Sequence, residues 1–342
     1  MRRIAWVFVV ILGIFAFISG CGEKSPEEVV SDLSKRSEKL ESYKSKGKMT
    51  IHTGKTPQAY EVEVWFKKPH FYRVSLKNTK KDITQILLRN DEGVYVLTPH
   101  LEKSFRFQSD WPENSGQVYL YQSLLESIID DSARKLTTSE KSLQFEVAAN
   151  YPQNQSLKVQ RIWMDDDYNP QKVEVLNDEQ KLMVEVLFDQ FEADPSFDKD
   201  AFDMERNMIG LAGRSVPTLA EKKAAGKKKD AVRVLTPEWI PEGSKLAEEK
   251  TVDTPRGKTV IMRYKGKKPF TLTQRNPEAI ETSIQVYGKP IDLGYTMGVL
   301  LEMDGKKRLS WTYEGTDFDL YGALQEKEMI KLAQSVYGQD SK

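Results

Sequence analysis

The sequence contains little cysteine, no surplus of either charge and few long apolar runs. Its 342 residues include one cysteine, which excludes an intrachain disulfide and any zinc or iron–sulfur site built from several cysteines. Basic and acidic residues both number 51, so the formal net charge is zero. Proteins that bind nucleic acid through its phosphates need a surplus of basic residues, so we expect no nucleic-acid partner. The 39% hydrophobic content fits a globular chain of about two domains.

The motifs that carry most enzyme chemistry are also missing. The sequence has no P-loop, no Gly-x-Ser-x-Gly elbow and no dinucleotide fingerprint. His52, His70 and His100 lack the spacing of a metal-binding pair. The run 165–167 is three aspartates, but an EF-hand loop needs alternating carboxylates, a central glycine and a distal glutamate, so we interpret this run as a solvated turn. We therefore expect a non-enzymatic protein with no metal site and no cofactor.

The one long apolar run lies at the amino terminus and ends at the cysteine. Residues 4–19 follow a basic start and are too few for a membrane span of ~20 residues, but they suit the core of a signal peptide. Ile18, Ser19 and Gly20 then precede Cys21, an order that resembles the lipobox of bacterial lipoproteins. In that family the cysteine thiol receives a diacylglyceryl group and the chain is cut before it. The alternative is an uncleaved signal anchor in which Cys21 is an exposed thiol.

Lipidation would place the mature chain on the extracytoplasmic face of the cell membrane, since two acyl chains suffice for stable anchoring. The chain then divides into a signal peptide (1–20), a lipidated tether (21–25), a first domain (26–205), a linker (206–233) and a second domain (234–338). Loss of the signal peptide leaves a net charge of −2, whereas the linker carries +6. We interpret the linker as solvated, the alternative being contact of its lysines with an anionic bilayer.

In the first domain, a helix is followed by short strands. Ser25, Pro26 and Glu28 form a capping-box pattern ahead of a predicted amphipathic helix over 26–42. Alternating residues then predict strands at 48–52, 60–66, 71–76, 83–88, 94–97, 104–108, 143–147, 158–164, 172–176 and 182–188. Their turns are too short for crossover helices, so we expect antiparallel neighbours, interrupted by an amphipathic helix over 117–131.

Four local patterns in this region look familiar in their order. They are the aromatic, basic, proline turn at 65–71, the hairpin at 90–99, the turn at 165–172 and the phenylalanines between 188 and 202. Together, over about 47–203, they resemble the LolA-like lipoprotein-carrier family, which includes LolA, LolB and the sensor RseB. The resemblance implies an α+β fold in which helices plug the open face of an incomplete antiparallel β-barrel, with an apolar cavity for acyl chains between them.

The resemblance also implies candidate site residues. The cavity would lie between one face of the strands and the 117–131 helix, and its candidate residues are Trp65, Phe71, Tyr95, Leu97, Phe105, Phe107, Tyr121, Leu124, Leu125 and Ile128. Alternation shows only that a face is apolar, so an ordinary packed core is the alternative. Lys68 stands where the carriers usually have a gating arginine, and lysine lacks the planar bidentate contacts of arginine.

The second domain opens with Pro237, Trp239, Pro241 and Gly243 and closes with a predicted helix around 324–337. It resembles a small α+β domain of sporulation-associated surface proteins, and RseB likewise adds a small domain to a LolA-like one. The whole chain is most similar to LolA-like lipoproteins of spore-forming bacilli. We therefore expect a sensing or lipid-handling role in spore formation, with an acyl chain or lipoprotein as ligand. The alternative is a scaffold that docks a membrane-protein partner on its curved sheet.

Overall fold

A computed structural model describes residues 24–52, 57–80, 83–107, 111, 117–139, 141–151, 156–212, 232, 234–254, 257–277, 283–285, 288–294, 296–313 and 315–336. The predicted signal peptide, the lipobox with Cys21 and most of the basic linker lie outside these residues. None of the helices in the described residues is long and apolar enough to cross a membrane.

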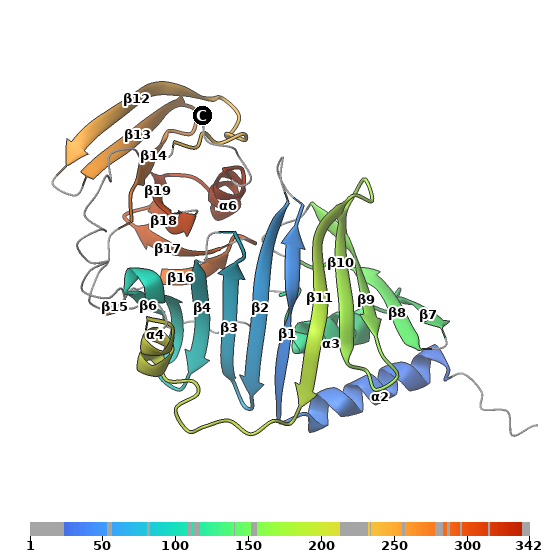
Figure 1. Cartoon of the computed structure of the whole chain (residues 1–342). Helices are drawn as coiled ribbons and strands as arrows, with labels where there is room; N and C mark the ends of the chain where they lie inside the picture. Colours follow the sequence, from blue (N-terminus) through green and yellow to red (C-terminus); the bar gives the residue numbers. More distant parts are fainter. Residues whose placement is uncertain are drawn as a thin grey trace, which may run out of the picture.

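A large curved sheet dominates the first part of the chain (Figure 1). Its strands are β1 (Ser42–Ile51), β2 (Gln58–Lys67), β3 (Phe71–Asn78), β4 (Thr84–Asn90), β5 (Gly93–Thr98), β6 (Lys103–Phe107), β7 (Lys135–Ser139), β8 (Ser142–Ala148), β9 (Leu157–Met164), β10 (Pro170–Asn177) and β11 (Leu182–Ala193). Two antiparallel meanders, β1–β6 and β7–β11, meet where β1 pairs with β11. A short strand from the second part, β15 (Ser283–Gln285), joins the β6 edge in parallel.

Two helices pack on one face of this sheet. Helix α2 (Pro26–Lys39) has the predicted capping box, and helix α3 (Tyr121–Asp130) crosses the sheet beside it. Val29 and Leu33 of α2 join the α3 residues and one set of strand residues in a single buried cluster. The predicted α+β class and open antiparallel sheet with plugging helices are confirmed.

The predicted first helix was too long at its end. Helix α2 stops at Lys39, because Leu40 adopts an extended backbone, and Tyr43 lies in β1. Leu40 and Tyr43 are both buried and stand three residues apart, which is a helical spacing, whereas the burial of Tyr43, Ser45 and Gly47 follows the period of two of β1. The sequence pattern alone could not separate the two.

Gly47 lies where the pairing of β1 with β11 shifts by one residue. A Cβ atom at this position would stand 2.3 Å from the carbonyl oxygen of Leu187, which belongs to the backbone and cannot rotate away. We expect Gly47→Ala to lower the free energy of unfolding by about 1–3 kcal/mol, because the strands must separate locally. Urea denaturation measures this, and Lys48→Ala on the exposed neighbouring position should change the value by less than about 0.5 kcal/mol.

The second part of the chain forms a seven-stranded antiparallel sheet with a helix on one face. Its elements are β12 (Ser244–Thr254), β13 (Gly257–Gly266), β14 (Phe270–Arg275), β16 (Gly288–Asp292), β17 (Met297–Met303), β18 (Lys306–Tyr313), β19 (Thr316–Gly322) and α6 (Glu326–Gln334). Met329, Ile330, Leu332 and Ala333 of α6 are buried against it. The predicted closing helix is confirmed. The sequence also predicts strands at 259–264, 270–274, 299–303 and 309–313, which lie within β13, β14, β17 and β18, whereas β12, β16 and β19 were not predicted.

The start of the predicted linker is helical. Helix α4 (Met204–Ala212) begins ahead of position 206 and packs against the outer side of the curved sheet near β5. Its Met204 and Met208 contact buried side chains, so an apolar stripe is present. Among the described side chains this stripe consists of two methionines, and two residues are too few to give a recognisable helical pattern in the sequence.

Candidate functional site

The concave face of the curved sheet is filled by aromatic and aliphatic side chains. Tyr121, Leu124, Leu125 and Ile128 of α3 are 0% exposed, and so is Phe107 of β6. A channel open to an acyl chain would leave accessible surface on the atoms that line it. At these positions the space between α3 and the sheet is therefore occupied by the protein's own side chains.

The predicted cavity residues do not share one face, and this prediction was wrong. Phe105 and Phe107 lie on the α3 side with the main core. Trp65, Phe71, Tyr95 and Leu97 belong to a second cluster on the opposite face of the sheet. The strand residues that do face α3 with Phe107 are the neighbours in sequence, including Val64, Phe66, Tyr72, Val94 and Val96.

The error arose at the turns between strands. Within each strand, alternate residues were correctly assigned to opposite faces. Which of the two sets faces α3 depends on the number of residues in the turn before the strand. Between β5 and β6 the short helix η1 (Pro99–Leu101) and left-handed Glu102 reverse the chain, so that Phe107 pairs with Val94 and not with Tyr95. The sequence alone does not give the register of the hairpins, so it cannot predict which set of residues in each strand faces inward.

The second cluster is closed by the segment that follows β11. Phe197 packs on Trp65 and Phe202 on Phe71, with ring centroids 5.6 Å apart in both pairs. Arg73 then connects this segment to the sheet, since its Nε donates to Asn207 Oδ1 at 2.6 Å and its Nη1 donates to Glu63 Oε2 at 2.9 Å. The aromatic pairs and the Arg73 hydrogen bond therefore position α4 on this outer face of the sheet.

The predicted gate residue, Lys68, lies at the end of α2. Its Nζ donates to the carbonyl oxygen of Glu38 at 2.5 Å and contacts Glu41 Oε1 at 3.1 Å. A positive charge is favourable at the carboxyl end of a helix dipole, so this contact stabilises the last turn of α2. A gating role for Lys68 stays a prediction.

A buried ion pair joins the two sheets. Lys103 Nζ of β6 lies 2.6 Å from Asp317 Oδ2 of β19, and the two side chains are 8% and 11% exposed. Nearby, Gln85 of β4 accepts a hydrogen bond from the Met297 amide at 2.6 Å and donates to the Met297 carbonyl at 3.3 Å. These contacts and the continuous apolar cluster across both parts make one body of the two sheets.

A partly buried carboxyl group lies at the same junction. Burial raises the pKa of Asp292 to about 6, whereas the amide of Gly294, which donates to Asp292 Oδ1 at 2.6 Å, acts in the opposite direction. Burial is the main cause that raises the pKa of the phenols of Tyr119, beside α3, and Tyr151, after β8. The negative charge of Asp292 raises both pKa values further. Sequence reasoning missed Gln85, Lys103, Asp292 and Asp317, since each is an ordinary polar residue in its local pattern.

The Asp292 side chain should make stability depend on pH. A carboxyl whose pKa is raised on folding favours the protonated state, so its penalty is absent below the unfolded pKa near 4 and is fully developed above about 6. We expect Asp292→Asn to raise the melting temperature at pH 7.5 and to change it little at pH 4. A melting-temperature difference that is the same at both pH values would contradict this.

No group of three or more His, Cys, Asp or Glu side chains in the described residues is arranged to hold a metal ion. The aspartate run at 165–167 forms a turn. Asp165 Oδ1 accepts hydrogen bonds from the amides of Asp167 and Asn169 at 3.0 and 2.8 Å.

Comparison with known proteins gives matches along the whole chain. Residues 1–202 match the family described as "Sporulation protein YdcC-like", and residues 234–336 match a domain of unknown function, DUF4367. The chain is 44% identical over 349 residues to the sporulation protein YdcC of Bacillus subtilis (strain 168), with 100% of both chains covered.

Solved structures are similar at lower levels. A Pseudomonas aeruginosa MucA/MucB complex matches with a TM-score of 0.32 and 14% identity, over 90% of this chain and 97% of the other. LprF from Mycobacterium bovis matches with a TM-score of 0.35 and 11% identity, over 53% of this chain and 100% of the other.

Proposed function

Because the chain belongs to the sporulation protein YdcC-like family, we propose that it acts in spore formation as a lipid-anchored, non-catalytic protein that binds an envelope partner. The lipobox pattern at 18–21 supports the anchor, and the absence of catalytic motifs from the sequence supports a binding role.

One observation favours a protein partner over an acyl chain. The concave face is filled by α2 and α3, whereas large apolar side chains stand exposed on the second sheet. Met303 is 56% exposed at the end of β17 and Tyr321 is 43% exposed on β19. Lys306, which pairs with Met303, places its Nζ 5.4 Å from the centre of the Tyr321 ring. Met303 and Tyr321, with Lys306 between them, form a small exposed apolar patch, and such a patch is typical of a docking surface for another protein.

The docking role can be tested in sporulating cells with a photocrosslinking residue at position 303. We expect a discrete crosslinked product that disappears when Tyr321→Glu is added. The control has the crosslinker at position 250 on β12, which is also exposed and is separated from β19 by β13 and β14 in the sheet. Equal products at both positions, or none at 303, would contradict a docking surface at this patch.

The anchor can be tested separately. In Cys21→Ala, intact mass spectrometry should show a chain that keeps residues 1–20 and carries no lipid, whereas the wild-type chain should show the loss of residues 1–20 and the mass of the added lipid. An unmodified Cys21 in the membrane fraction would indicate an uncleaved signal anchor.

An apolar ligand is a second candidate, and a different observation favours it. Gln117 Nε2 and Gln122 Oε1, at the start of α3, are buried without a hydrogen-bond partner. Buried polar groups in this state are costly, and the polar end of a ligand under α3 would satisfy them. Native mass spectrometry of the mature chain without its anchor would detect such a ligand. An unliganded mass after mild extraction would rule against this candidate.

A further inference from the structure

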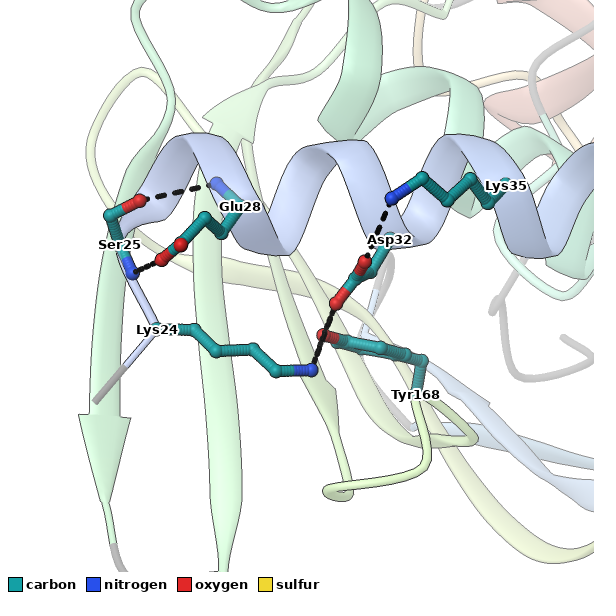
Figure 2. Close-up of polar contacts among 6 residues, drawn as sticks. All are labelled: Lys24, Ser25, Glu28, Asp32, Lys35 and Tyr168. Carbon is teal, nitrogen blue, oxygen red and sulfur yellow. Dashed lines mark hydrogen bonds and ion pairs between the residues drawn. The ribbon is translucent and has the colours of Figure 1, made fainter. Parts of the chain in front are cut away.

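The chain enters helix α2 in a fixed direction. Figure 2 shows that the amide of Ser25 donates to Glu28 Oε2 at 2.8 Å while the amide of Glu28 donates to Ser25 Oγ at 3.3 Å. Pro26 at the first helical position restricts the backbone further. Because Val29 and Leu33 are buried in the main core, the start of α2 is held at one place on the fold.

Lys24, just before the cap, is bound to two separate elements. Its Nζ donates to Asp32 Oδ2 of α2 at 2.8 Å and to the Tyr168 hydroxyl of the β9–β10 turn at 3.1 Å. The Tyr168 hydroxyl donates in turn to Asp32 Oδ2 at 3.3 Å (Figure 2). Hydrogen bonds to Asp32 and Tyr168 hold the pKa of the Lys24 ammonium above its usual range, so the group is charged at any physiological pH.

The proposed lipid lies very close to this point in sequence. Cys21 and Lys24 are three residues apart, and an extended chain spans at most about 3.6 Å per residue. The Cα atom of Lys24 is thus within about 11 Å of that of the acylated residue, which is about half the length of the 14-residue helix α2 at about 1.5 Å per residue. A tether this short keeps the adjoining surface at the bilayer whatever tilt the molecule adopts.

We propose that the start of α2 and the β9–β10 turn form the bilayer-facing end of the molecule, and that the second sheet is held away from the membrane. The inference rests on the proposed lipidation at Cys21. The start of α2 and the β12–β13 hairpin lie at opposite extremes of the molecule in Figure 1, so the two ends differ strongly in their distance from an anchor at Cys21.

The charge of the exposed side chains distinguishes this arrangement from a second one, in which the basic linker contacts the bilayer. Glu27, Glu28, Asp166 and Asp167 are exposed at the proposed end, and the exposed cation there, Lys24, is paired with Asp32. The exposed carboxylates therefore outnumber the cation, anionic headgroups do not attract this end, and the lipid alone holds it there. The competing arrangement has the basic residues of 213–230 on the bilayer. Helix α4, which leads into them, packs near β5 and η1 at the other end of the curved sheet, so the molecule would then lie flat.

Energy transfer to labelled lipids can distinguish the two arrangements. The lipidated full-length chain is placed in phosphatidylcholine vesicles, and in vesicles with added phosphatidylglycerol, with one donor label on Asp166→Cys or on Lys250→Cys, both exposed. We expect transfer from position 166 to exceed that from 250 several-fold in both vesicles. Equal transfer from the two positions, or a greater value at 250, would overturn the proposal. Equality found only with phosphatidylglycerol would support the flat arrangement and overturn it likewise.

Tether length provides the matched control. Inserting about 20 Gly and Ser residues between Gly22 and Glu23 gives a flexible spacer of about 25 Å, which should bring the transfer from 166 close to that from 250. An unchanged ratio would show that the short tether does not set the orientation. Intact mass spectrometry on the same samples separates the two failures. A chain without lipid contradicts the proposed function, whereas a lipidated chain with equal transfer contradicts only this inference.

Discussion

Replacing Lys103 by methionine should lower the free energy of unfolding by about 3–5 kcal/mol, because the change leaves the Asp317 carboxylate buried without its counter-charge. Thr312 Oγ1, at 2.6 Å from Asp317 Oδ1, then remains the nearest polar partner and carries no charge. Guanidinium denaturation followed by tryptophan fluorescence measures the effect.

Two further variants show whether the buried charge is the cause. Lys103→Met combined with Asp317→Leu should recover most of the loss, since a pair of apolar side chains removes the unpaired charge. Arg263→Ala breaks an exposed pair with Glu248, 56% and 45% exposed, and should cost less than about 1 kcal/mol. A double variant as unstable as Lys103→Met would show that the shape of the junction matters more than its charge.

Leu124→Ala should lower the free energy of unfolding by about 2–5 kcal/mol, because Leu124 is 0% exposed in the packed layer between α3 and the sheet. Urea denaturation of the mature chain measures the loss. Asp130→Ala, on an exposed position of the same helix, should change the value by less than about 0.5 kcal/mol.

This variant also bears on the ligand hypothesis. If α3 covered an open channel, truncating Leu124 would enlarge that channel at little cost in stability. A loss below about 1 kcal/mol would therefore contradict the packed arrangement and favour an acyl ligand under α3.

Local patterns predicted which segments form strands, and the structure shows why they could not predict which face each strand buries. Alternation places Tyr95 and Val94 on opposite faces, but only the pairing of Val94 with Phe107 shows that Val94 faces α3. The capping box at Ser25 was predicted correctly because all of its partners lie within one helical turn. Prediction succeeded where the deciding contacts were local.

The junction between the sheets could not be predicted for the same reason. Lys103 and Asp317 are separated by 214 positions, and Gln85 and Met297 by 212. Each of these polar residues fits an exposed strand position as readily as a buried one. Only the packing of the two sheets against each other brings each residue to its partner.

The strand β15 has a practical consequence for experiments that divide the chain. It pairs in parallel with β6 through Ser283, Ile284 and Gln285, although it comes from the second part of the chain. Deleting 234–338 would strip the first sheet of this edge strand and leave the Lys103 ammonium without Asp317. An uncovered edge invites self-association, so the shortened protein should aggregate. A lost interaction in such a deletion would thus report misassembly, and point substitutions are the sounder way to separate the two halves.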